Sequence, residues 1–182
     1  MSKSYIPPPI EKSYDCTEAY ASPEERYFTE RYALDVRFPG DDYRIFIHSN
    51  RICIVTLAPS HEMLMKEQQV AKVDFQVTDK RNTLESKVSG KRKHGAQRLL
   101  PTTPLFIAEC GHSSYKPCTG ITGKLLEVNK ALKENPQLLI SDPCRKGFLA
   151  ILLPDPTLVE TYKKELTTKE EFQKRKSQHL LI

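Results

Sequence analysis

Short apolar runs separated by glycine and proline turns constrain the fold of this chain more than any other feature. Alternating or β-branched residues predict strands at residues 43–47, 52–57, 70–78, 105–108, 121–128 and 148–153. Strands this short, closely spaced and joined by tight turns, are typical of a small barrel or sandwich. We therefore expect a fold that is mainly β, with helices added to it.

The helical signals lie between or after these strands. Ser60 is a candidate N-cap for a short helix. Thr168 and Glu171 have the spacing of a capping box, which predicts a late helix that carries Phe172. Just before it, apolar residues recur every four positions, as they do on one face of a helix: Leu158, Tyr162 and Leu166.

The first residues differ in texture from the rest of the chain. The run Pro7-Pro8-Pro9 disfavours both helix and central strand, and no apolar periodicity accompanies it. We predict a flexible acidic leader over residues 1–26 and a single domain over residues 27–180. An aromatic cluster at their junction is expected to form a short helix or irregular segment, which serves either as a partner-binding patch or, as we favour, a docking patch for the leader: Tyr27, Phe28 and Tyr32.

Charge is distributed unevenly along the sequence. The formal net charge is +5, but residues 1–42 hold five Lys/Arg and nine Asp/Glu, so the remaining 140 residues carry +9. Segment 80–98 contains seven basic residues and a single acidic one, Glu85. The basic residues are our candidate partner-binding set: Lys80, Arg81, Lys87, Lys91, Arg92, Lys93 and Arg98. Such a segment favours an acidic partner, either nucleic acid, an anionic surface or an acidic protein such as actin or tubulin. A solvated loop accounts for the same charges equally well.

Cysteine usage and motifs exclude several classes of protein. The five cysteines are odd in number and fit no secreted disulfide framework, so we expect reduced thiols in the cytosol or nucleus. A metal site could draw on four residues, but these lack tight C-x₂₋₄-C pairs, and we expect no metal: Cys110, His112, Cys118 and Cys144. No nucleophile or phosphate-loop motif is present, and no apolar run approaches the ~20 residues of a membrane span. We therefore predict no enzyme and no membrane span.

The second half of the chain resembles the glycine-cleavage H-protein family. In that family a strand G-x-V-x-E-V-N precedes A-L-x-x-N-P-x-L, then D-P, then G-W-L. This sequence has matching segments in the same order at residues 119–132, 134–138, 142–143 and 147–149. The resemblance covers most of residues 45–176. It implies a barrel-sandwich hybrid, the H-protein-like form of the lipoyl/biotinyl-type fold.

The carrier residue of the H-protein family is replaced in this sequence. That family attaches lipoate to the lysine of an E-S-V-K-A hairpin, where this chain keeps Glu109, has Cys110 at the serine and His112 at the lysine. Imidazole cannot form the stable amide that joins lipoate to a lysine amine, and Lys116 lies four residues further on. We therefore expect no lipoate, and a lipoyl-type carrier subunit is the disfavoured alternative.

The remaining motifs resemble the Abitram family, also called Simiate. Four segments carry the resemblance: residues 26–29, 48–53, 87–97 and 126–129. It implies actin binding, to G- and F-actin, with effects on polymerisation and filopodia. It also implies residence in nuclear speckles, cytoplasm and cell projections, so we expect neither secretion nor mitochondrial import. The sequence is also compatible with a nuclear RNA-associated scaffold and with a structural subunit of a larger complex.

Overall fold

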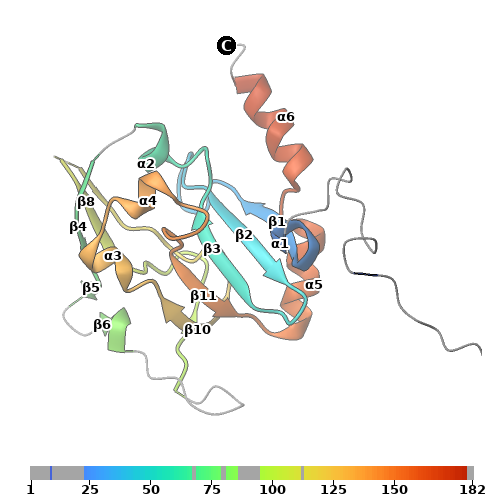
Figure 1. The fold of residues 1–182 in the computed structure, drawn as a ribbon, viewed down its shortest axis with the longest axis horizontal. Coiled ribbons are helices and arrows are strands. Elements are labelled where there is room, and N and C mark those ends of the chain that lie inside the picture. The colour runs from blue at the N-terminus through green and yellow to red at the C-terminus, as the bar shows by residue number, and fades with distance from the viewer. Residues whose placement is uncertain are drawn as a thin grey trace, which may run out of the picture.

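The computed structural model describes residues 9, 23–66, 69–78, 81–85, 95–111 and 113–179. Its largest element is an antiparallel six-stranded sheet in the order β1-β2-β3-β11-β10-β7 (Figure 1). Along the sheet these strands are Phe28–Ala33, Tyr43–His48, Cys53–Leu57, Ala150–Leu153, Gly123–Val128 and Arg98–Leu99. Four predicted strands overlap strands of this sheet: residues 43–47, 52–57, 121–128 and 148–153.

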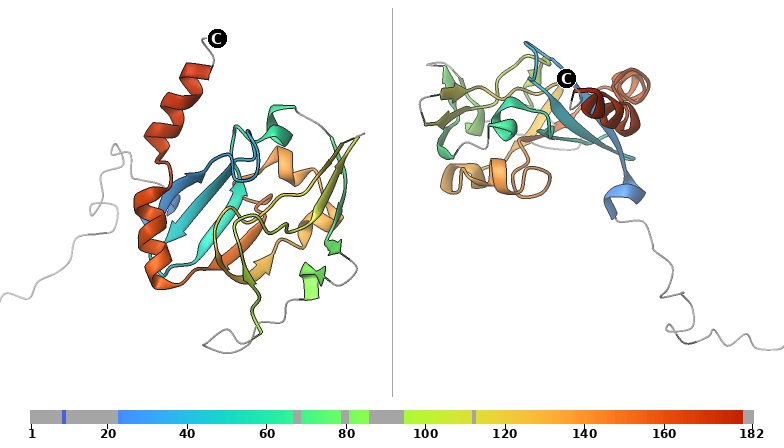
Figure 2. Two further views of the ribbon diagram at one scale, coloured as in Figure 1. Left: turned by 180° about the vertical axis from the view of Figure 1, so that it is seen from behind. Right: turned by 90° about the horizontal axis from the view of Figure 1, so that it is seen from above.

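Two smaller sheets complete the β structure. One has the order β4-β8-β9, formed by Val70–Asp74, Ile107–Cys110 and Ser113–Tyr115. The other pairs β5 (Gln76–Thr78) with β6 (Arg81–Asn82), and a 3₁₀ turn, η2, follows at Thr83–Glu85. Figure 2 shows the β4-β8-β9 sheet beside the larger sheet.

Alternation along the strands builds the core. Tyr43, Ile45 and Ile47 of β2 are all fully buried, and so are alternate residues of β3. They pack in one cluster with residues of the smaller sheet and its flanks, such as Phe106 and Leu105. Burial of apolar surface at this density is the main stabilising term for such a domain.

Six helices are assigned within the described residues. The short ones are α1 (Pro23–Tyr27), α2 (Glu62–Met65), α3 (Ala131–Glu134) and α4 (Leu138–Ser141). The longer α5 (Pro156–Glu165) and α6 (Lys169–His179) contact β1, and α6 extends beyond the body of the domain (Figures 1 and 2). None of these helices is both long and apolar enough to cross a membrane.

The late helices confirm the C-terminal prediction. The amide of Thr168 donates to Glu171 Oε2 at 2.8 Å, and the amide of Glu171 donates to Thr168 Oγ1 at 3.3 Å. This reciprocal pair is a capping box, and it starts α6 at the predicted place. Phe172 then stacks on Tyr32 with ring centroids 4.0 Å apart and planes at 4°.

The segment that resembles the H-protein motif forms a structural junction between α3, α4 and β11. Asn129 is buried and donates through Nδ2 to the carbonyls of Lys146 and Phe148 at 2.6 and 2.9 Å. At Gly147 an added Cβ would lie 2.0 Å from the Leu138 carbonyl oxygen, so no larger residue fits without a shift. These motif residues therefore have structural roles: Asn129 bridges two backbone carbonyls, and Gly147 allows close packing against Leu138.

Three expectations from the sequence are corrected. Residues 28–33 form strand β1, with register from Phe28↔His48 to Ala33↔Tyr43, and not a helix or irregular segment. The open edge of β2 accepts this strand because its backbone groups otherwise lack partners. The cap of α2 is His61, because Ser60 donates to Asp42 instead.

The third correction is the single strand predicted over residues 70–78. It divides at Phe75, which is buried and packs edge-on against Phe106. Before that point the chain pairs with β8, and after it β5 pairs with β6. The predicted leader lies outside the described residues, apart from Pro9 and the start of α1.

Candidate interaction site

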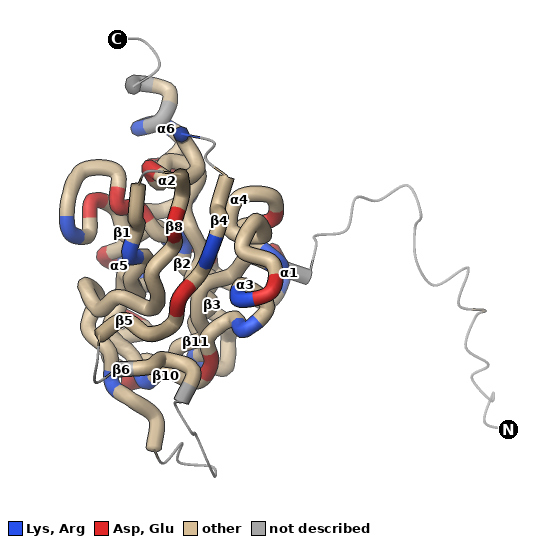
Figure 3. Tube along the Cα trace, turned by 90° about the vertical axis from the view of Figure 1, so that its left-hand side faces the viewer, with Lys and Arg blue, Asp and Glu red and all other residues tan. Residues whose placement is uncertain are grey.

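The basic segment is only partly described by the structure. Lys80, Lys87, Lys91, Arg92 and Lys93 lie outside the described residues. Arg81 contributes its backbone to β6, and Arg98 lies in β7. In the described parts of the chain, acidic and basic positions are interspersed on the side that shows β4 and β8 (Figure 3).

Arg98 has a partner inside the protein. Its Nη1 lies 2.7 Å from Asp155 Oδ2, in a pair whose side chains are 56% and 45% exposed. An ion pair this exposed adds little stability, but it neutralises the Arg98 charge that we predicted would contact a partner. Of the seven predicted cations, Arg98 is the one whose side chain is described.

The hairpin of β8 and β9 occupies the place of the predicted carrier hairpin. Residue 112, where the lysine would be, lies outside the described residues, and Gly111 at the turn has φ +57°. Lys116 follows the end of β9 and is exposed. It is therefore displaced from the tip, as its sequence position predicts.

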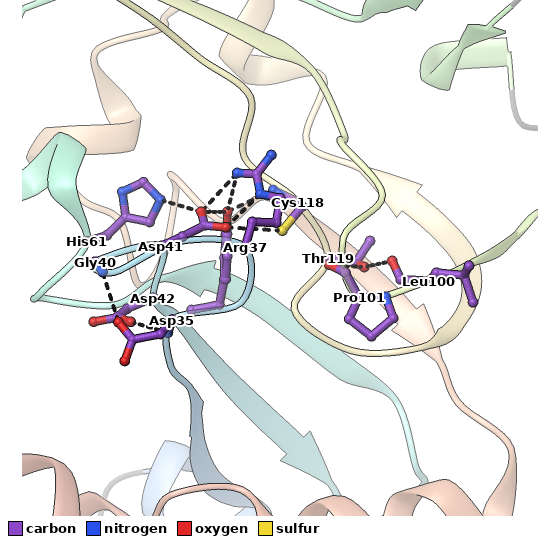
Figure 4. Close-up of polar contacts among 11 residues, drawn as sticks. Asp35, Arg37, Gly40, Asp41, Asp42, His61, Leu100, Pro101, Cys118 and Thr119 are labelled. Carbon is purple, nitrogen blue, oxygen red and sulfur yellow. Dashed lines mark hydrogen bonds and ion pairs between the residues drawn. The ribbon is translucent and has the colours of Figure 1, made fainter.

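The loop between β1 and β2 is organised by its own carboxylates (Figure 4). The amide of Asp35 donates to Asp42 Oδ1 at 2.7 Å, and the amide of Gly40 donates to Asp35 Oδ1 at 2.9 Å. Arg175 of α6 reaches Asp35 at 2.6 Å. Some acidic residues of segment 1–42 therefore stabilise this loop through hydrogen bonds and an ion pair.

Asp41 is the most enclosed carboxylate of this loop. Oδ2 accepts from Arg37 Nε at 2.7 Å, while Oδ1 accepts from Arg37 Nη2 at 2.9 Å and from the Tyr43 hydroxyl at 2.5 Å. Burial alone would raise the pKa of Asp41, but the hydrogen bonds from Arg37 and Tyr43, together with the nearby His61, outweigh it and hold the pKa well below its usual range. Asp41 is therefore ionised at neutral pH.

Tyr43 joins this loop to the segment that follows β9. Its hydroxyl accepts from the amide of Cys118 at 3.0 Å while it donates to Asp41. Burial, followed by the nearby Cys118 and Asp41, raises the pKa of Tyr43 far above its usual value. The phenol is therefore a permanent donor to Asp41.

His61 lies beside Asp41 with one ring nitrogen unused. Its Nδ1 accepts from the amide of Met63 at 3.1 Å, so the neutral ring carries its proton on Nε2. Nε2 is 3.6 Å from Asp41 Oδ1, beyond hydrogen-bond distance, and has no hydrogen-bond partner among the described residues. The side chain is only 3% exposed, which makes this unused donor unusual.

A pocket of about 480 Å³ lies over this cluster, and we call it the α2 pocket. Its walls are residues 37–41, helix α2 with its flanks, and residues 113–117 at the end of the hairpin. Asp41 and His61 line it, together with cationic and hydroxyl side chains: Arg37, Lys66, Lys116, Ser113, Ser114 and Tyr115. The pocket thus brings together three segments that are distant in sequence.

A second pocket, of about 500 Å³, lies near α6 and the outer strands, and we call it the Glu30 pocket. Arg44 Nε lies 2.8 Å from Glu30 Oε1, and Lys169 Nζ lies 3.8 Å from Oε2. The Tyr32 hydroxyl also donates to Glu30. Burial would raise the pKa of Glu30, but the hydrogen bonds from Arg44 and Tyr32 lower it overall.

Three of the four candidate metal ligands are described by the structure, and these three do not form a cluster. Cys144 lies in the Glu30 pocket, 3.0 Å from Arg44 Nη1, whereas Cys118 lies near Asp41. Burial raises the pKa of the Cys110 thiol and of the Cys118 thiol, which disfavours the thiolate that metals bind. No group of three potential ligands occurs among the described residues, which do not include His112.

The aromatic cluster packs on this chain's own strands and last helix. Tyr32 stacks on Phe172, and Phe28 packs edge-on against Phe46 and His48. Tyr27 is 56% exposed. The predicted docking patch is therefore occupied by β2 and α6.

The Asp41 cluster is a site that the sequence did not indicate. The run Pro39-Gly40-Asp41-Asp42 reads as a turn, and its partners lie in β2, before α2 and after β9. Two consecutive acidic residues leading into an apolar strand were the available signal. Their partners follow only from the tertiary fold.

Comparison with known proteins agrees with this architecture. The glycine cleavage H-protein family model matches residues 104–179. A solved glycine cleavage system H protein from Mycobacterium marinum superposes with a TM-score of 0.51 at 16% identity, over 81% of this chain and 96% of that chain. The predicted fold, an H-protein-like barrel-sandwich hybrid with added helices, is confirmed.

Three curated relatives share one name, "Protein Abitram". The chain is 38% identical to that of Gallus gallus, over 81% of this chain and 86% of the relative. It is 34% identical to that of Homo sapiens, over 82% and 83%. It is 36% identical to that of Dictyostelium discoideum, over 71% and 74%. The similarity extends over most of the length of this chain and of each relative.

Proposed function

The chain belongs to the Abitram family, and from that premise we propose that it is a non-enzymatic actin-binding protein that modulates actin polymerisation. Filopodia and other cell projections are the proposed setting, with a nuclear role at speckles linked to transcription. The domain acts in this proposal as a rigid interaction module, with the nucleus and the cytoplasm as its locations.

The absence of a carrier lysine carries this proposal over the lipoyl alternative. The sequence has histidine at residue 112, and the nearby lysine, Lys116, follows β9 instead of standing at the turn. Lipoate transfer needs an amine at the end of a hairpin that partner enzymes can reach. The fold thus persists here without the group that its carrier relatives use.

The distribution of charge supports an acidic partner. Residues 43–182 carry +9, and segment 80–98 contributes a large share of it. Lys174 adds an exposed cation on α6, which stands clear of the domain body (Figure 1). Cations on separate elements can contact one acidic surface together, and such contacts weaken as salt rises.

Co-sedimentation with actin filaments tests the proposal. The full chain is pelleted at about 50 mM and about 200 mM salt, with a triple variant in which Lys91, Arg92 and Lys93 are changed to Gln. The matched control changes three exposed lysines elsewhere: Lys130, Lys133 and Lys146. We expect the native chain and the control to pellet at low salt, and the triple variant to remain in the supernatant.

Every contrary outcome has a definite meaning. Undiminished pelleting of the triple variant removes segment 80–98 from the mechanism. Absence of pelleting for the native chain overturns direct filament binding. Tight RNA binding with a steep salt slope in a parallel filter assay would instead support a nuclear RNA-associated scaffold.

A polymerisation assay tests modulation separately from binding. Pyrene-labelled monomeric actin is assembled with and without the full chain. A changed elongation rate or lag supports modulation, while unchanged kinetics at saturating concentration reduces the proposal to binding alone.

A further inference from the structure

The α2 pocket presents hydrogen-bond donors and few free acceptors. Its two carboxylates already have partners, since Asp41 is held by Arg37 and Tyr43, and Glu62 pairs with Lys66. Lys116 is exposed and has no ion-pair partner among the described residues. The chemistry left for a ligand is therefore that of an acceptor, and an anion fits best.

One exposed apolar side chain stands beside these donors. Phe38, which lines the pocket, is 43% exposed, whereas Met65 on α2 is 64% exposed but is not part of the pocket lining. They are two of the four large apolar side chains that are exposed within the described structure. Exposed aromatic and methionine side chains next to charged groups are typical of sites that bind peptides.

His61 Nε2 is a hydrogen-bond donor that could replace Arg37 at Asp41, and we call it the reserve donor. Figure 4 shows the imidazole directed at Asp41, where Nε2 lies 3.6 Å from Oδ1. A movement of less than about 1 Å would bring this pair to hydrogen-bond distance. Asp41 would then stay paired if Arg37, which is 24% exposed at its side chain, turned one N–H toward a ligand.

We propose that the α2 pocket binds an acidic segment of a partner protein, with a ligand carboxylate between Arg37 and Lys116 and an apolar ligand side chain on Phe38. His61 is a positioning residue: its Nε2 donates a hydrogen bond to Asp41 when Arg37 turns to the ligand. This site is separate from segment 80–98 and does not rest on actin being the partner.

An NMR titration of the full chain with short peptides tests the site. The probe is acetyl-Asp-Glu-Leu-Asp-Glu-amide, and the control peptide is acetyl-Asn-Gln-Leu-Gln-Asn-amide. We expect amide shifts from the acidic peptide in segments 37–41, 61–66 and 113–117, at every residue except Pro39 and Pro117, which have no amide proton. The neutral peptide should give none, since it lacks the carboxylates that Arg37 and Lys116 would bind.

Charge reversal at the pocket is compared with charge reversal elsewhere. Lys116→Glu should weaken binding of the acidic peptide at least about fivefold, because it opposes the ligand carboxylate directly. Lys130→Glu, at an exposed lysine outside the pocket, should change affinity less than about twofold. Equal weakening by both variants would mean general electrostatic attraction and would overturn the site.

A third variant examines the reserve donor without removing the helix cap. In His61→Asn the amide oxygen can still accept from Met63, but the shorter side chain no longer extends a donor to Asp41. We expect a folded protein, judged by its amide spectrum, with affinity for the acidic peptide reduced about threefold or more. Unchanged affinity overturns the role of His61. Loss of the folded spectrum would overturn the view that its cap suffices for the fold.

Inorganic phosphate distinguishes a peptide from a free anion. Phosphate that shifts the same amides, with no binding of the acidic peptide, would assign the pocket to small anions and overturn the peptide proposal. Replacing Leu by Ala in the probe should weaken binding to the native chain. It should matter less in Phe38→Ala, since the apolar contact is then already missing.

Discussion

The Glu30 pocket and the α2 pocket are nearly equal in size, at about 500 and 480 Å³, but they differ in how their charges are paired. In the Glu30 pocket one carboxylate accepts from Tyr32 and faces both Arg44 and Lys169. In the α2 pocket Lys116 has no ion-pair partner among the described residues, and His61 Nε2 lies 3.6 Å from Asp41 Oδ1 and, like Arg44 Nε, has no hydrogen-bond partner there. A pocket whose central charges are satisfied internally holds the fold together, whereas unused donors favour a ligand.

The same comparison separates two uses of acidic residues. Glu30 joins β1 to α6, and Asp41 joins the β1–β2 loop to β2 and His61. Asp41 is 1% exposed at its side chain and Glu30 is 15% exposed. Removal of Asp41 should therefore cost more, because water cannot replace its lost contacts.

The largest expected effect comes from Asp41→Asn. Loss of the charge breaks the paired contact with Arg37 and weakens the bond from Tyr43, and we expect the free energy of unfolding to fall by about 3 kcal/mol. Urea denaturation followed by circular dichroism measures it. The matched control is Glu160→Gln, at an exposed pair with Lys163, which should cost less than about 0.5 kcal/mol.

The pH dependence of stability tests the same contact without disrupting the neutral-pH structure. The pKa of Asp41 is lowered in the folded state, so its stabilisation is complete above the unfolded pKa of about 3.9 and is lost as pH falls toward the folded pKa. The difference in unfolding free energy between the native chain and Asp41→Asn should therefore narrow below about pH 4. A constant difference down to acid denaturation would contradict the assignment.

Glu30→Gln tests the satisfied pocket. The amide can keep the bond from Tyr32 but loses the charge that faces Arg44 and Lys169, and we expect a cost of about 1 kcal/mol in urea denaturation. Affinity for the acidic peptide should stay unchanged. Loss of peptide binding in this variant would erase the distinction between the two pockets.

The smallest effect is expected at the described end of the basic segment. Arg98→Ala removes an exposed pair with Asp155 and should change the unfolding free energy by less than about 0.5 kcal/mol. Filament co-sedimentation should also change little, because Asp155 already neutralises this cation. A large loss of pelleting would show that Arg98 leaves Asp155 for the partner.

Local patterns predicted most of the framework. Alternating, β-branched or continuous apolar residues located β2, β3, β10 and β11 to within a few residues, and the capping box at Thr168 located α6. These signals are local because a strand face and a helix start each depend on neighbouring residues. The H-protein resemblance added the arrangement of the strands, which no local pattern contains.

The candidate site depended on contacts that no local pattern encodes. Arg37 and Asp41 are close in sequence, but His61 and Cys118 reach them only through the fold. Strand β1 was missed for a similar reason. Its aromatic residues resemble a docking patch until the edge of β2 and the ring of Phe172 are in place.

The hairpin of β8 and β9 has a consequence for how this protein meets its partners. β8 ends at Cys110 and β9 begins at Ser113, so the turn is short, and the available amine lies beyond it at Lys116 beside the α2 pocket. An amine at a turn can deliver a bound group from one protein to another. Lys116 lies beside a pocket instead, and in our proposal it binds a carboxylate that the partner brings.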